Sequence, residues 1–225
     1  MKIDFKSFVK HFTKEKKNLF PTGSRVYYGY QGNGKTLSMV RYVKEVKKQF
    51  PKCLVFSNVD IFDIEYTPIR TPADLSNALS VANGDQGVLV CLDEAHLFFN
   101  NTRGGISLDV LTAISQQRKD RRKIVFTSQI WEELDISLRK QVPEVIKCKR
   151  LGNVIILTHY IGYTMKYHKQ ENEFIADKDY TEIYKLNDEL TKSYNTYQKI
   201  ITNSEYKREF ANNNYRSANN TYIKK

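Results

Sequence analysis

The stretch Gly29-Tyr30-Gln31-Gly32-Asn33-Gly34-Lys35-Thr36 fits G-x-x-x-x-G-K-[ST], the pattern of a phosphate-binding P-loop. A β-favouring run precedes it over residues 25–28, and apolar residues at helical spacing follow it. Strand, loop and helix in this order are the context that the motif requires. We expect the following residues to bind a nucleotide: Gly29, Gln31, Gly32, Asn33, Gly34, Lys35, Thr36 and Leu37.

The residue types of this loop predict how it holds phosphates. Gly32 and Gly34 allow backbone N–H groups to turn inward around the anion. The helix that begins near Lys35 directs the positive end of its dipole at the same place. Lys35 is expected to reach the β and γ oxygens, and the Thr36 hydroxyl is expected to bind Mg²⁺.

A second motif lies at the end of an apolar run over residues 87–92, which Asp93 and Glu94 follow directly. Such a run is typical of a strand buried on both faces. Asp93 is expected to bind Mg²⁺ through water, and Glu94 to orient and polarise the attacking water. Alone, the run is equally consistent with a buried strand before an acidic helix start. Together with the P-loop it predicts a protein that binds a nucleoside triphosphate.

Composition limits the remaining possibilities. A chain of 225 residues is long enough for one α/β domain with additions. Its net charge of +11 favours an anionic partner, nucleic acid before membrane, unless a coding bias inflates the Lys and Asn content. No apolar window predicts a transmembrane segment, and no signal peptide is recognisable. Cys53, Cys91 and Cys148 lack metal-ligand spacing and are expected to be buried thiols in a reducing cytosol.

The expected fold class is α/β, a mostly parallel sheet flanked by helices with a C-terminal β-hairpin addition. We expect strands over residues 52–59 and 124–127, and a hairpin of residues 145–149 and 154–160. Helices are expected over residues 71–81, 108–117 and 135–140.

The chain divides into four expected segments: a basic amphipathic helix (1–22), an ATPase core (23–165), an extension packed on the core (166–202) and a flexible, polar, basic tail (203–225). The first helix is expected either to lie on the core or to contact DNA, a membrane or a neighbouring subunit. A short helix is expected near residues 180–190. Tyrosines in the tail could stack on bases or stay solvated.

Gln129 closes the strand expected beside the carboxylate strand. In that place its amide could contact the γ-phosphate or the attacking water, or it could simply cap the strand end. The polar segment 101–105, after the second motif, is expected to face a substrate or to be a surface turn.

The order of the motifs resembles that of RecA-like P-loop ATPases of the ASCE type, which carry a catalytic Glu. The N-K-x-D motif of GTPases is absent, and a small kinase would need an Arg-rich lid. Residues 93–96 spell the DEAH signature of helicases. However, those helicases need two RecA-like domains and a Ser-Ala-Thr motif, so we interpret this match as coincidental.

Residues 24–160 are more similar to the zonular occludens toxin-like ATPases of the FtsK–HerA superfamily, which includes phage assembly and genome-packaging ATPases. The similarity is carried by residues 28–36, 93–96, 114–129 and 134–139. Tyr194-Asn195-Thr196 also resembles a Tyr-Asp-Thr element of some relatives, with Asn in place of Asp. The resemblance implies ATP and Mg²⁺ as cofactors, a ring (commonly a hexamer) and ATP-driven movement of DNA.

The resemblance also implies that a neighbouring subunit supplies an arginine to the transition state. Arg118 and Arg139 are the first candidates, followed by Arg121 and Arg122. These cations could instead contact DNA phosphates or lie on a solvated face.

Filamentous-phage members carry a membrane span and an outer domain, and neither is found in this sequence. The expectation is therefore a DNA-translocating, genome-packaging motor in the host cytoplasm or on the virion. It would bind DNA independently of sequence and dock on a capsid or portal-vertex protein. The alternative is an assembly ATPase of the zonular occludens toxin type, which organises virion export or a membrane complex without moving DNA.

Overall fold

The computed structural model describes residues 19–99, 108–168 and 173–195. The segment 101–105, the tail 203–225 and most of the expected helix 1–22 lie outside these ranges. The strands are β1 (Gly23–Tyr28), β2 (Leu54–Ser57), β3 (Thr67–Pro68), β4 (Val88–Leu92), β5 (Arg122–Ser128), β6 (Glu144–Leu151), β7 (Val154–Ile161), β8 (Lys166–His168), β9 (Glu173–Ile175) and β10 (Lys178–Lys185). The α-helices are α2 (Lys35–Gln49), α3 (Pro72–Ser80), α4 (Leu108–Ser115), α5 (Ile136–Arg139) and α6 (Asp188–Thr191).

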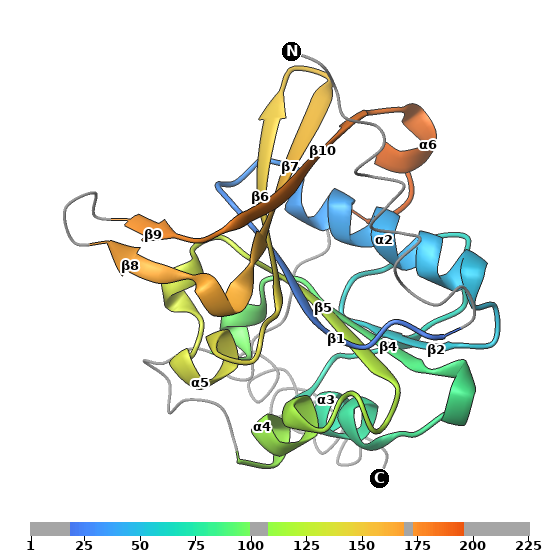
Figure 1. Ribbon diagram of the computed structural model, residues 1–225. Coiled ribbons are helices and arrows are strands. Elements are labelled where there is room, and N and C mark those ends of the chain that lie inside the picture. Colours follow the sequence, from blue (N-terminus) through green and yellow to red (C-terminus); the bar gives the residue numbers. More distant parts are fainter. Residues whose placement is uncertain (1–18, 100–107, 169–172, 196–225) are drawn as a thin grey trace, which may run out of the picture.

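Within the described residues the main sheet has eight strands in the order β10-β7-β6-β1-β5-β4-β2-β3. The strands from β6 to β3 are parallel, and β7 and β10 are added antiparallel at one side. Helix α2 covers one face, and α3, α4 and α5 cover the other (Figure 1). The expected mostly parallel sheet flanked by helices is therefore confirmed.

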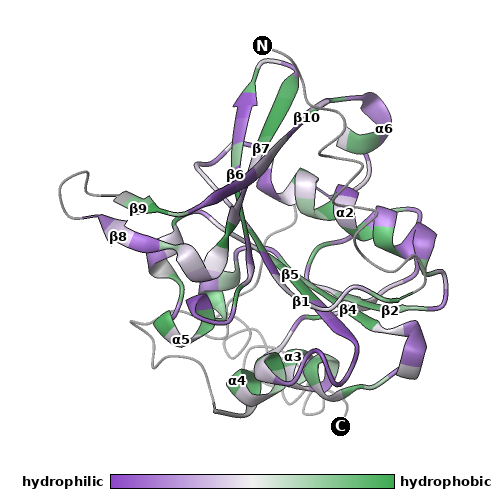
Figure 2. Ribbon diagram, in the orientation of Figure 1, coloured by the Kyte–Doolittle hydropathy of each residue, from purple (hydrophilic) through white to green (hydrophobic). Residues whose placement is uncertain are grey.

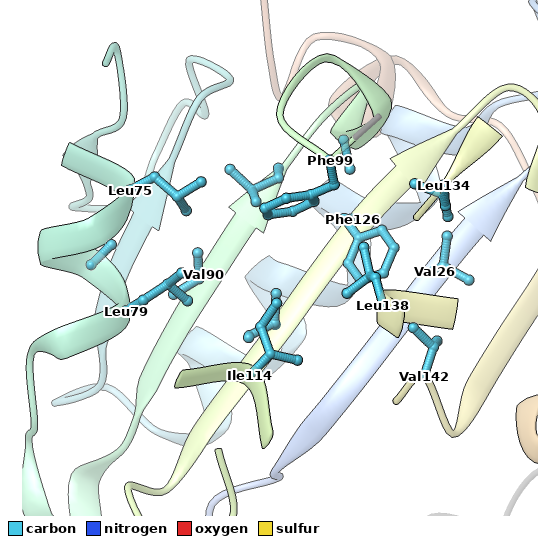
Figure 3. Close-up of a cluster of buried hydrophobic side chains, with 14 of the residues drawn as sticks. Val26, Leu75, Leu79, Val90, Phe99, Ile114, Phe126, Leu134, Leu138 and Val142 are labelled. Carbon is cyan, nitrogen blue, oxygen red and sulfur yellow. The ribbon is translucent and has the colours of Figure 1, made fainter. Parts of the chain in front are cut away.

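The buried strands alternate their side chains between the two faces, so each face has its own apolar core. On β4, Val90 packs towards α3 and α4, whereas Leu89 and Cys91 pack towards α2. Figure 3 shows the first of these cores, in which Phe126 of β5 lies close to Leu138 of α5. All five residues of β4 are buried, and Figure 2 shows this strand as hydrophobic, which agrees with its apolar sequence.

Helix α3 begins as its sequence predicts. The Thr71 hydroxyl accepts a hydrogen bond from the Asp74 backbone N–H at 3.1 Å, and the Asp74 carboxylate accepts one from the Thr71 N–H at 2.8 Å. Pro72 occupies the first helical position, where its missing N–H costs nothing.

The prediction of a helix near residues 180–190 is wrong for most of that range. Residues 178–185 form the edge strand β10, which pairs antiparallel with β7, and only Asp188–Thr191 is helical. The physical reason is a period of two: Glu182 and Tyr184 point towards α2, where they contact Arg41 and Ser38. β-branched and aromatic residues in this alternation favour a strand. Figure 2 shows β10 as largely hydrophilic, unlike the central strands.

The β6–β7 hairpin forms as expected, and Gly152 adopts a positive φ of 57° in its turn. All three cysteines are free and buried, although Cys53 lies one residue before β2 and not within a strand. Burial raises the pKa of the Cys148 thiol to about 12, so it is protonated at neutral pH. Across the described ranges, no helix has the length and apolar character needed to span a membrane.

A partly buried ion cluster joins the starts of β1, β5 and β6. Glu144 accepts hydrogen bonds from Arg25 and Lys123, and the Arg25 guanidinium lies 3.9 Å from the centre of the Tyr42 ring. Burial alone would raise the pKa of Glu144, but the charges of Arg25 and Lys123 outweigh it and lower the pKa to about 2. The carboxylate is therefore ionised in the folded protein well below its ordinary range.

We predict that Glu144→Gln destabilises the protein by about 3 kcal/mol at pH 7, because buried Lys123 and partly buried Arg25 lose their counter-charge. The Glu144 pKa is depressed on folding, so its stabilisation is present above the unfolded pKa and is lost as pH falls towards about 2. Urea unfolding at pH 7 and at pH 3 should show a smaller difference between variant and wild type at the lower pH. Glu65→Gln, at an exposed position, is the control; equal unfolding free energies at pH 7 would contradict the prediction.

Candidate nucleotide-binding and hydrolysis site

The P-loop connects β1 to α2 and packs tightly against the β6–β7 hairpin. Gly34 has a φ of 78°, and a Cβ on it would lie 2.6 Å from Ile155 Cδ1. A Cβ on Gly29 would lie 2.7 Å from the Cys148 carbonyl oxygen. Both contacts are closer than real Cβ atoms allow. At Gly29 the close atom belongs to the backbone, so packing and a φ of 143° both require glycine; at Gly34 the tip of the Ile155 side chain can shift, and the positive φ is what requires glycine.

The first turn of α2 follows the P-loop directly and has no side-chain cap. Its N-cap, Gly34, provides no side-chain cap, so the first N–H groups of the helix are available for an anion. Lys35 is buried, and its Nζ donates to the Tyr30 carbonyl oxygen at 3.4 Å. A buried ammonium beside uncapped N–H groups is a site for phosphate.

Thr36 and Asp93 meet at the carboxyl ends of β1 and β4. The Thr36 hydroxyl donates to Asp93 Oδ1 at 2.8 Å, and the Thr127 hydroxyl donates to the same oxygen at 2.6 Å. Burial raises the pKa of Asp93, whereas these hydrogen bonds and the charge of Lys35 oppose the rise. A hydroxyl and a carboxylate oxygen are hard ligands of the kind that Mg²⁺ accepts, with water and phosphate completing its coordination, so these residues fit the ion.

Glu94 is held in an unusual backbone conformation, with a φ of 50°. Its N–H donates to the Thr127 hydroxyl at 2.9 Å, and its Oε1 accepts from Gln129 Nε2 at 3.4 Å. Its Oε2 lies 3.2 Å from His96 Nδ1, but these two buried atoms have no hydrogen-bond partner in the part of the chain that is described. Glu94 also lines the cavity beside the P-loop, so its carboxylate has hydrogen-bonding capacity that the described residues do not use.

Asn58 is a site residue that the sequence motifs do not reveal. It follows β2, and its amide group donates to the Asp93 carbonyl oxygen at 2.9 Å and accepts from the Asp93 N–H at 2.7 Å. This double hydrogen bond fixes the backbone between β4 and Glu94. The only signal in the sequence is the position of Asn58 at the end of a predicted strand.

One cavity of about 510 Å³ joins these groups. Of the residues predicted to bind nucleotide or metal, it is lined by Gln31, Gly32, Gly34, Lys35, Thr36, Leu37, Asp93 and Glu94. Gly29, Asn33 and Gln129 lie beside it: the Asn33 side chain accepts from the Arg150 N–H at 3.4 Å. Arg150, Leu186 and Tyr194 also line the cavity. No motif names Arg150 or Leu186, whereas Tyr194 begins the element that resembles Tyr-Asp-Thr.

Four arginines are candidates for the residue that a neighbouring subunit supplies to the transition state. Three of them lie before or at the start of β5, at the opposite end of the strand from the P-loop. Arg118 is exposed there, and Arg121 forms an ion pair with Asp85 at 2.9 Å. Arg122 is buried and bonds Asp120 and the Val81 carbonyl oxygen within its own chain. Its burial removes Arg122 from the candidates for a neighbouring nucleotide.

Arg139 lies on α5, away from the cavity that holds the P-loop. Its guanidinium stands 5.5 Å from the centre of the Phe174 ring of β9. Partial burial lowers its pKa, and the nearby Glu132 and Asp135 oppose this change. Within one chain, neither Arg118 nor Arg139 reaches the P-loop.

One of the three solved structures compared with the chain, the first below, supports the fold. The N-terminal domain of zonular occludens toxin from Neisseria meningitidis superposes with a TM-score of 0.55 and 18% identity, covering 77% of this chain and 100% of that domain. The genome-packaging NTPase B204 of Sulfolobus turreted icosahedral virus 2, in complex with ATP-gammaS, gives a TM-score of 0.49 and 12% identity, covering 68% and 95% of the two chains. The DNA-packaging ATPase B204 of Sulfolobus turreted icosahedral virus gives 0.48 and 13%, covering 68% and 95%.

A search of curated proteins finds no match to this sequence. A family model does match it, and it does so over residues 25–199, which include the P-loop, the paired carboxylates, the β6–β7 hairpin and β10. The resemblance inferred from the motifs is confirmed: the chain belongs to the zonular occludens toxin (Zot) family.

Proposed function

We propose that this protein is an ATPase of the FtsK–HerA type that moves DNA, acting as an oligomeric ring in packaging a viral genome. The observation that carries the hydrolytic part is the contact between Thr36 and Asp93 at 2.8 Å, with Glu94 directly beside it. Binding groups and a candidate base for water thus converge at one cavity.

In the proposed reaction, Lys35 and the N–H groups of the P-loop hold the phosphates of ATP. Thr36 and Asp93 would hold Mg²⁺, which neutralises charge on the phosphate oxygens when it is bound. Glu94 accepts a hydrogen bond from the attacking water and aligns it with the terminal phosphate. Gln129, whose amide already contacts Glu94, reports the state of that phosphate to β5.

The proposed ring would complete this site with an arginine from a neighbouring subunit, which raises turnover by on the order of 10³-fold or more. Arg150 is the one arginine among the described residues that lines the cavity. Because it lines the cavity of its own chain, it would contact the nucleotide bound to that same chain. Arg118 and Arg139 remain the proposed trans residues, because exposed Arg118 and half-buried Arg139 lie on surfaces that a second copy can approach.

We assign the hydrolytic core to residues 23–165 and regard residues 166–202 as an extension packed on it, preceded by the segment 1–22 and followed by the tail 203–225. The net charge of +11 supports DNA as partner, bound through its phosphates and without sequence preference. A capsid or portal-vertex protein would anchor the ring, in the host cytoplasm or on the virion.

Membership of the Zot family favours a second candidate function. In it, the protein uses ATP to organise phage assembly or a membrane complex, and no DNA passes through the ring. Both functions use the same site, so the response to DNA separates them.

We predict that double-stranded DNA stimulates steady-state ATP hydrolysis at low salt, and that the stimulation fades as salt rises because phosphate contacts release counterions. Turnover is measured with and without DNA over a salt series, with the Glu94→Gln protein as blank. Turnover that does not respond to DNA at any salt concentration would favour the assembly function over the motor.

A further inference from the structure

We propose that the segment of residues 186–195, which follows β10, forms the wall that holds the base of the bound nucleotide. This inference deepens the proposed function and rests on it, since it assigns the base-binding part of the same site. Within that segment, Tyr194 and Leu186 are the residues that would pack against the base.

The segment is anchored to the core at both of its ends. The Leu186 N–H donates to the Asn153 carbonyl oxygen at 3.0 Å in the turn of the β6–β7 hairpin. At the other end, Tyr194 forms an isolated antiparallel bridge with Ile61, and the Asn195 N–H donates to the Asp60 carbonyl oxygen at 3.0 Å. The segment therefore crosses from the antiparallel side of the sheet to the chain that leaves β2.

Between these anchors the segment is held by hydrogen bonds of its own and by one from the chain that follows β2. The Asn187 side chain caps α6 by accepting from the Leu190 N–H at 2.9 Å. Ser193 is buried, and its carbonyl oxygen accepts from the Phe62 N–H at 2.8 Å. Helix α6 lies beside α2 in Figure 1, so this crossing places the segment next to the helix that carries the P-loop lysine.

The lining of the cavity combines two kinds of group. The P-loop residues with Asp93 and Glu94 form its polar part, where the phosphates of the proposed nucleotide would lie. Leu37, Val59, Leu186 and Tyr194 form an apolar part of the same lining. A nucleotide whose phosphates lie on the P-loop would place its base against these four side chains.

The chemistry of this apolar part suits a base. Leu186 and Tyr194 both pack against the buried core on the α2 side, so they present supported and preorganised surfaces. An aromatic ring and aliphatic side chains offer faces on which a planar base can stack. Thr191 and Asn195, which also line the cavity, add polar groups at its border. The cavity volume lies within the range of small-molecule sites.

The test compares two ligands, MgATP and magnesium tripolyphosphate, which has the same phosphates but no base. We expect Tyr194→Ala to weaken ATP binding about 10-fold, because one stacking contact is lost, and to leave tripolyphosphate binding unchanged. Tyr194→Phe, which keeps the ring, should restore the ATP affinity. Tyr163→Ala, at an exposed tyrosine remote from the cavity, is the matched control. Both affinities are measured by titration calorimetry on proteins that keep Glu94. The temperature is kept low so that little ATP is hydrolysed during the titration.

The affinity for tripolyphosphate also shows whether a variant is folded, because a misfolded variant would bind neither ligand. Unchanged ATP affinity in Tyr194→Ala would overturn the inference, and so would a loss of the same size for both ligands. Failure of the wild-type protein to bind either ligand would contradict the proposed function itself, and the inference with it. Loss of ATP affinity alone supports both.

Discussion

Replacing Glu94 by Gln is expected to abolish ATP turnover while ATP binding is retained. The substitution keeps the size of the side chain and an oxygen that can accept from Gln129, but removes the charge that polarises water. Loss of a general base lowers turnover by about 10²- to 10⁴-fold. Glu94 Oε2 has no hydrogen-bond partner in the described structure, and its contact there is His96 Nδ1 at 3.2 Å, so the change breaks no hydrogen bond of that atom.

The measurement pairs steady-state hydrolysis with the affinity for ATP. Glu65→Gln makes the same chemical change at an exposed position and should leave both quantities at wild-type values. Wild-type turnover in Glu94→Gln would show that another group activates the water. Equal losses of binding and turnover would show that Glu94 shapes the cavity and does not act on the reaction.

Replacing Lys35 by Ala is expected to weaken ATP binding about 100-fold and to reduce hydrolysis to background, since charge-assisted hydrogen bonds to phosphate are lost. The fold should tolerate the change. The Lys35 side chain is buried, and the Tyr30 carbonyl oxygen is the hydrogen-bond acceptor recorded for its Nζ within the described structure. The change removes one positive charge near Asp93, but the hydrogen bonds from Thr36 and Thr127 to that carboxylate remain.

Thermal unfolding without nucleotide distinguishes the two effects. Lys35→Ala should unfold at or above the wild-type temperature, yet gain no stability on addition of MgATP, because a ligand stabilises only the protein that binds it. Lys48→Ala, at an exposed position on the same helix, should behave as wild type. Stabilisation of Lys35→Ala by MgATP to the wild-type extent would exclude the lysine from the phosphate site.

The parts of the site that form locally could be predicted from the sequence. The P-loop, α2 and the pair Asp93-Glu94 each depend on residues close together in the chain, and their meeting follows from parallel strands ending at one edge. Asn58 and Arg150 could not be predicted in this way. They reach the site because β2 and β6 occupy particular places in the strand order, which no local pattern encodes.

The error over residues 178–185 has a similar cause. Tyrosine, threonine and glutamate occur in short helices as well as in edge strands, so composition favoured neither, and the alternation that favours a strand is short. What decides the outcome is the free edge of β7, with which β10 pairs along its whole length, and Arg41 on α2, which binds Glu182. Both are contacts between residues far apart in the chain, so a local sequence pattern cannot predict them.

The central place of β1 in the sheet governs how the chain must fold. Val26 pairs with Phe126 on one side and Val145 on the other, both about one hundred residues or more further along the chain. At a synthesis rate of about 5–20 residues per second, the P-loop strand stays without either neighbour for at least about 5 s. Sheets with such distant pairings fold slowly. ATP therefore cannot assist the early steps and stabilises only a chain whose later strands are already in place.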